Sequence, residues 1–210
     1  YEKIENQWIF PKTDKIFIDN IGEVHNYVKK NYPNFKCIRI GEAYMTNNIM
    51  NFLKQINLKA DSSCIPGRKR VDKEKSFDWS NSPNRTYFPS KKNYQLENKE
   101  DNKFIEIPMN TIQTKCSYDK SNLLRYANLA FKNEVIYKGL RKYIEENDSL
   151  VTISHPYEFS NDFLNNKNLI YGDISILERN IECIVKICRE LNKKINFITI
   201  NDIIKENIYA

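Results

Sequence analysis

The fold class is decided by residues 36–63, which read KCIRIGEAYMTNNIMNFLKQINLKADSS. The apolar stretch 36–40 precedes a helical stretch whose apolar residues recur every three or four positions, with Thr46 where an N-cap is expected. A second apolar stretch, 58–63, ends in polar residues. This strand, helix, strand order is typical of a parallel α/β sheet, in which the helix connects one strand to the next.

The same alternation continues along the chain and predicts a single α/β domain over residues 1–210. Apolar stretches predict further strands at 104–107, 111–115, 149–154 and 195–200. Amphipathic stretches predict helices at 19–32, 123–131, 135–146 and 173–193, with Asn201 capping a short final helix.

Residues 64–103 interrupt this alternation with prolines, charges and scattered aromatic residues. A stretch of this size is too long for an ordinary connection between elements. Its aromatic content argues against disorder, because disordered segments are poor in aromatic residues. We therefore expect a long excursion that serves the function.

Composition excludes several classes of protein. The chain carries a formal charge of +6 with 40% hydrophobic residues, and its length suffices for a sizeable core. No apolar run approaches the length of a membrane helix, and no stretch resembles a signal peptide, so we expect no membrane span. The one tight basic cluster, Arg68 to Arg70, is followed at once by mixed charges, and we expect no nucleic-acid partner.

The cysteines and histidines exclude a zinc finger or ribbon. Five cysteines form no CxxC pair, and the chain has only two histidines, His25 and His155. Free cysteines in apolar surroundings favour a reducing compartment, which predicts a cytoplasmic location. His25 lies inside a helical stretch and is interpreted as structural.

Three predicted strands end in the residue types of a functional site. In parallel α/β folds the chemistry lies beyond the carboxyl ends of the strands, and there the chain places Arg39, Asp61 and His155. Each has a structural alternative, namely a surface cation, a turn cap and a strand-end histidine. Together they suit catalysis, because a carboxylate can orient a histidine general acid and an arginine can stabilise developing negative charge.

Six short blocks stand in order along the chain. They are RIGEAY at 39–44, DSS at 61–63, PG at 66–67, DW at 78–79, EIP at 106–108 and VTISHP at 151–156. Their order and rough spacing resemble the polysaccharide deacetylase (NodB-homology) family, and the resemblance runs from about Trp8 to Asp202.

The resemblance implies a distorted, incomplete β/α barrel that removes N-acetyl or O-acetyl groups from a carbohydrate, such as a cell-surface or capsular polysaccharide or its precursor. It implies that His155 protonates the leaving group, that Asp61 tunes this histidine and that Arg39 orients the catalytic base. It also implies that the walls of a sugar-binding groove include three aromatic residues, Tyr44, Trp79 and Tyr157.

The resemblance also implies a divalent metal, commonly zinc, but the family's first motif and its metal-binding histidine pair have no counterpart here. Gly41 and Glu42 stand where the family has Pro and Tyr. Because the chain begins at Tyr1, we expect the metal ligands upstream and none from this chain. One alternative is a catalytically inactive module that binds a glycan or a partner. Another is a basic protein that uses residues 68–75 to bind nucleic acid or an anionic surface.

Overall fold

The computed structural model describes residues 2–4, 7–9, 14–71, 76–98, 102–159 and 173–208. These divide into two compact units. Unit 1 comprises Tyr1–Pro108 with Ile198–Ala210, and unit 2 comprises Met109–Phe197. No sheet among the described residues closes into a barrel, and the incomplete barrel stays a prediction. None of the described helices is both long and apolar enough to cross a membrane.

Unit 1 is built on a parallel sheet of three short strands, β3 (Cys37–Ile38), β4 (Ala60–Asp61) and β7 (Ile105–Glu106), in that order. All three lie inside stretches predicted as strands. Ile38 pairs with Asp61, and Asp61 pairs with Glu106. The two carboxyl side chains are therefore neighbours on adjacent strands.

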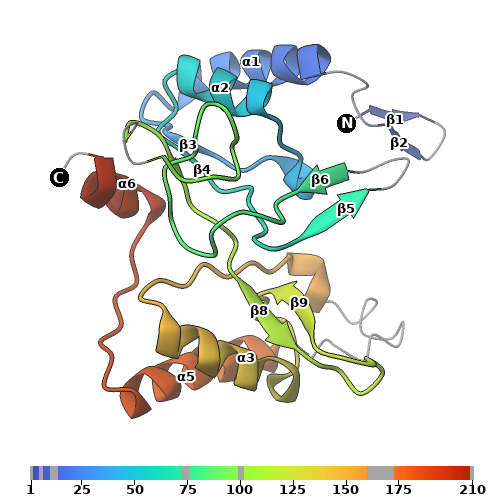
Figure 1. Cartoon of the computed structure of the whole chain (residues 1–210), viewed down its shortest axis with the longest axis vertical. Helices are drawn as coiled ribbons and strands as arrows, with labels where there is room; N and C mark the ends of the chain where they lie inside the picture. The colour runs from blue at the N-terminus through green and yellow to red at the C-terminus, as the bar shows by residue number, and fades with distance from the viewer. Residues whose placement is uncertain are drawn as a thin grey trace. The chain divides into compact units, whose positions relative to one another are not determined.

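Helices α1 (Asp14–Asn31) and α2 (Asn47–Gln55) pack together, and their apolar faces share one hydrophobic core with the sheet (Figure 1). The predicted cap is confirmed, because the Thr46 hydroxyl accepts a hydrogen bond from Ile49 N at 3.3 Å. The α2 stripe Ile49, Met50 and Leu53 is fully buried, which stabilises the fold by roughly 2 kcal/mol per side chain.

The long excursion contributes buried residues to unit 1. Strands β5 (Lys69–Val71) and β6 (Ser76–Asp78) form an antiparallel hairpin. Tyr87 pairs by backbone hydrogen bonds with Glu106 of β7. Three of the aromatic residues are buried: Trp79, Tyr87 and Tyr94.

The remaining elements of unit 1 are the hairpin of β1 (Glu2–Ile4) and β2 (Gln7–Ile9), the turn η1 (Gly41–Ala43) and the helix α6 (Ile200–Ile208). The cap of α6 is Thr199 and not Asn201, since Thr199 and Asp202 bond each other's backbone N–H groups.

Unit 2 contains a β8 (Thr111–Thr114) and β9 (Leu123–Tyr126) hairpin, helices α3 (Asn133–Glu146) and α5 (Ser175–Glu190), and the turn η2 (Pro156–Phe159). The two helices pack against each other, and α3 packs on the hairpin (Figure 1). This arrangement buries a second hydrophobic core.

Three predictions need correction. The helix expected at 123–131 is wrong, because 123–126 form β9 and pair antiparallel with β8. The strand expected at 195–200 is absent from the described elements, and Phe197 in it is 82% exposed. Residues 149–154 are not assigned as a strand, although Val151 and Ile153 hydrogen-bond to Asn110 and Ala127.

Candidate functional site

The carboxyl edge of the unit 1 sheet brings Arg39 together with the residues that follow β4. Arg39 Nε donates to Ser62 O at 2.8 Å, and its Nη2 donates to Ser62 Oγ at 2.8 Å. Ile40 N donates to Ser63 Oγ at 2.8 Å. Neighbouring parallel strands end at the same edge, which explains why these residues meet.

Asp61 is fully buried at this edge and forms a pair with Glu106. Asp61 Oδ1 accepts from Ser63 Oγ at 2.7 Å, and Oδ2 accepts from Ser63 N at 3.1 Å. Glu106 Oε1 accepts from Cys64 N at 3.0 Å. No donor among the described residues bonds Glu106 Oε2, and a proton on the Glu106 carboxyl can bond the neighbouring Asp61 carboxylate.

The electrostatics of this pair follow from its burial. Desolvation raises the pKa of Glu106 well above its ordinary value, and the neighbouring Asp61 charge raises it further. Desolvation also raises the pKa of Asp61, against the effect of its hydrogen bonds. A proton held between the two carboxyl groups, on Glu106, is the state that fits this geometry.

The aromatic residues expected to line a groove divide into two kinds. Trp79 belongs to the core, because its ring is fully buried, its Nε1 donates to Ala43 O at 2.8 Å and Tyr94 packs against it edge-on. This placement corrects the groove-wall assignment for Trp79. Tyr44 is half-buried, and its hydroxyl donates to Asp14 Oδ1 at 3.2 Å.

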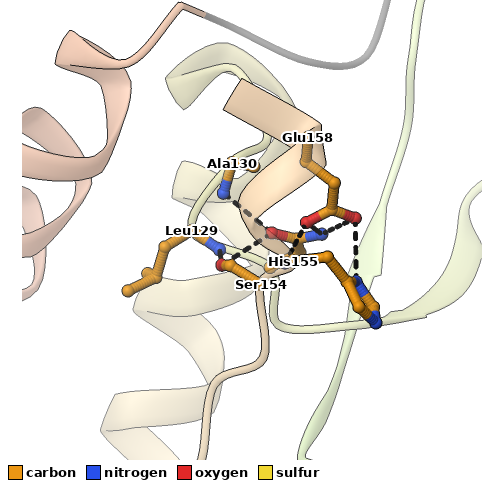
Figure 2. Close-up of polar contacts among 6 residues, drawn as sticks. Leu129, Ala130, Ser154, His155 and Glu158 are labelled. Atoms are coloured by element: carbon orange, nitrogen blue, oxygen red, sulfur yellow. Dashed lines mark hydrogen bonds and ion pairs between the residues drawn. The ribbon is translucent and has the colours of Figure 1, made fainter. Parts of the chain in front are cut away.

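His155 lies in unit 2, directly before η2, at the edge of a compact polar network (Figure 2). Its Nδ1 lies 3.4 Å from Glu158 Oε1. Nδ1 itself is buried, whereas the side chain as a whole is 43% exposed. The ring of Tyr157 stacks on the imidazole at a centroid distance of 5.2 Å and is 55% exposed.

Glu158 is the carboxylate that faces His155, and it was not among the predicted site residues. Glu158 is 1% exposed and accepts from His155 N at 2.7 Å. Side chains three residues apart lie on the same side of a 3₁₀ turn, which brings the imidazole and the carboxylate together. A carboxylate three residues after an N-cap commonly reaches back to the cap N–H, so HPYE carried a signal for Glu158.

Asn128 completes the network from the link between β9 and α3. Its Nδ2 donates to both Glu158 oxygens at 2.9 Å, and its Oδ1 accepts from Ala130 N at 2.8 Å and Ser154 Oγ at 2.9 Å. Nothing in the sequence pointed to Asn128, because a helix was expected there.

The predicted catalytic residues are thus divided between the units. Arg39 and Asp61 belong to unit 1, and His155 belongs to unit 2. The Asp61 carboxylate accepts from Ser63 and lies beside Glu106, and the carboxylate beside His155 is Glu158.

The described residues do not fit the zinc that the resemblance implies, because no three His, Cys, Asp or Glu side chains among them could hold a metal ion together. All five cysteines are free thiols, and burial raises the pKa of the Cys37 thiol to about 12. His25 is buried with its ring 6.1 Å from that of Phe35, in agreement with a structural role.

No protein-family model, curated protein or solved structure matches the chain.

Proposed function

We propose that this protein hydrolyses N-acetyl or O-acetyl groups on a carbohydrate, and that His155 is the proton donor to the leaving group. The observation that carries the proposal is a half-exposed imidazole whose buried nitrogen faces a buried carboxylate, Glu158. The substrate class is an acetylated polysaccharide or its precursor, as the resemblance implies.

The geometry of unit 2 suits general acid catalysis. When an acetamide is hydrolysed, the oxygen of water bonds to the carbonyl carbon, the C–N bond breaks and the amine nitrogen takes up a proton. The proton that the attacking water gives up restores the acid for the next turnover. A protonated imidazole beside that nitrogen can supply the proton, and a buried carboxylate stabilises the imidazolium. The exposed ring of Tyr157 offers an apolar face on which a sugar ring can stack.

The sheet edge of unit 1 has a supporting role in this proposal. Arg39 is exposed and presents a guanidinium that can orient a carboxylate or stabilise negative charge. Asp61 acts through Ser63. The Ser63 hydroxyl donates a hydrogen bond to Asp61, and its oxygen accepts a hydrogen bond from Ile40 N. Tyr44, half-buried beside this edge, stays a proposed wall of the sugar groove.

The test uses the protein expressed from its natural reading frame and acetylated oligosaccharides with N-acetyl or O-acetyl groups. We expect acetate release that falls roughly 100-fold or more in His155→Gln, because general acid catalysis contributes about that much. His25→Gln, which replaces the other histidine, is the matched control, and this variant should release acetate at the unsubstituted rate. Turnover that is unchanged in His155→Gln would exclude His155 as the acid, and absence of acetate release from every oligosaccharide would exclude the deacetylase.

A glycan-binding module without catalysis is the second candidate, and the exposed Tyr157 ring on His155 is the observation that favours it. It predicts saturable oligosaccharide binding by calorimetry without release of acetate. Tyr157→Ala should abolish the binding, whereas Tyr118→Ala, another exposed tyrosine of unit 2, should not. Binding that survives Tyr157→Ala would contradict this candidate.

A further inference from the structure

We infer that Glu158 is the positioning residue of His155: it keeps a proton on Nδ1 and so presents Nε2 as the reactive nitrogen, while Asn128 holds Glu158 in place. The catalytic consequence rests on the proposed function, but the arrangement of protons does not. The inference deepens the proposal by replacing Asp61 with Glu158 as the carboxylate that acts on His155.

The hydrogen-bond directions around Asn128 are fixed by backbone donors. Ala130 N and Leu129 N can only donate, and they donate to Asn128 Oδ1 at 2.8 Å and to Ser154 Oγ at 3.2 Å. The Ser154 hydroxyl then donates to Asn128 Oδ1 (Figure 2). The carboxamide nitrogen of Asn128 must therefore point at Glu158.

The carboxylate of Glu158 consequently meets donors. The Asn128 amide donates to both oxygens, and His155 N donates to Oε2. All three groups are donors, which suits a carboxylate at Glu158. A nearby positive charge stabilises a buried carboxylate, and an imidazolium at His155, with Nδ1 3.4 Å from Oε1, can supply that charge.

The exposed part of the ring gives the second half of the inference. Because Nδ1 is buried while 43% of the side chain is exposed, the accessible edge is the one that carries Nε2. A proton kept on Nδ1 by Glu158 leaves the Nε2 lone pair free in the neutral imidazole.

In this arrangement the proton that leaves His155 is taken up by the leaving amine. In the imidazolium form, Nε2–H gives its proton to the electron pair that the breaking C–N bond leaves on the amine nitrogen. The imidazole becomes neutral and keeps its proton on Nδ1, which lies 3.4 Å from Glu158 Oε1. The opposite tautomer would leave Nδ1 as a bare acceptor facing a carboxylate, which is unfavourable.

The test measures ¹⁵N chemical shifts of the two imidazoles in the full chain, which differ strongly between protonated and bare nitrogens. The chain has only two histidines, so His155→Gln assigns the spectrum. We expect His155 to show Nδ1–H and a bare Nε2 when neutral. The Nε2–H tautomer in the unsubstituted protein would overturn the inference, whether or not any variant folds.

Two variants separate positioning from packing. In Glu158→Gln the share of Nδ1–H at His155 should fall while the His25 shifts stay constant, and in the control Glu178→Gln, on the exposed face of α5, neither histidine should change. On acetylated oligosaccharides, kcat should fall roughly 10- to 100-fold in Glu158→Gln with KM nearly unchanged. Unchanged tautomers in Glu158→Gln would refute the positioning role, whereas absent turnover in the unsubstituted protein would refute only the proposed function.

Discussion

Glu106 and Asp61 show how one proton can determine the stability of a sheet edge. Two adjacent carboxylates without water are strongly disfavoured, so the pair retains a proton. Because the pKa of Glu106 is raised above its ordinary value of 4.5, its proton contributes stability that is fully present below pH 4.5. This contribution is lost as the pH rises through the raised pKa.

Glu106→Gln should remove this pH dependence. The carboxamide can donate to Asp61 without a titrating proton and can keep accepting from Cys64 N. We expect the urea midpoint of the unsubstituted protein to fall as the pH rises above 4.5, and that of Glu106→Gln to change less. Tryptophan fluorescence measures it, because Trp8 and Trp79 both belong to unit 1.

Glu23→Gln, the same substitution on the exposed part of α1, is the matched control and should leave the pH dependence unchanged. A flat midpoint in the unsubstituted protein would mean that no proton is shared between Asp61 and Glu106.

The sequence predicted the positions of the site residues better than it predicted which side chains they contact. Arg39 and Asp61 were predicted at the sheet edge because strand ends are visible in a hydrophobic pattern. The partner of Asp61 depends on the register between β4 and β7, which are separated by the long excursion, and register across such a gap is not readable from one sequence. Glu158 was readable, since it depends on a local turn.

Among the elements, α3 lies against β8 at a glycine, Gly139. A Cβ at position 139 would lie 2.4 Å from Gln113 O and 3.2 Å from Ile112 Cβ. Both partners are backbone or packed core atoms, so α3 or β8 would have to move to admit a methyl group. Gly139 is therefore required by packing, although glycine disfavours helices.

Gly139→Ala should destabilise the protein by about 1–3 kcal/mol, the usual range for overpacking. Gly22→Ala is the matched control in α1, where the new Cβ would meet Phe52 Cζ at 3.5 Å, an ordinary contact. Gly22→Ala should stabilise the protein by about 0.5–1 kcal/mol through helix propensity. Urea unfolding followed by circular dichroism measures both, and equal signs for the two substitutions would contradict the packing argument.

The elements that the sequence predicted correctly are those with local causes. The cap and buried stripe of α2 lie within one segment. The final helix was also predicted, but its cap is Thr199 and not the expected Asn201. The segment LLRY at 123–126 forms a strand because β8 supplies its backbone partners, and such tertiary pairing overrides weak helical preference. The segment 195–200 has a strand-like composition but no such pairing among the described strands.

For the whole molecule, the division into two units has no counterpart in the composition, which does not change around residue 108. Each unit has its own core. One contains Trp79, Leu53 and Phe104, and the other contains Ile136, Leu140 and Ile187. A hydrophobic pattern shows which residues are buried but not which buried residues share a core, and a division of this kind therefore escapes prediction from one sequence.

The buried thiols allow transient opening to be measured separately in each unit. Cys64 lies in the core of unit 1, and Cys116 and Cys188 lie in that of unit 2. A thiol reagent reaches such groups only during transient opening, so each labelling rate reports how often its surroundings open. Gly139→Ala should accelerate the labelling of Cys116 and Cys188 and leave the rate at Cys64 unchanged, as measured by mass spectrometry of the labelled peptides. Equal acceleration of labelling at all three thiols would show that the two units open together in one cooperative step.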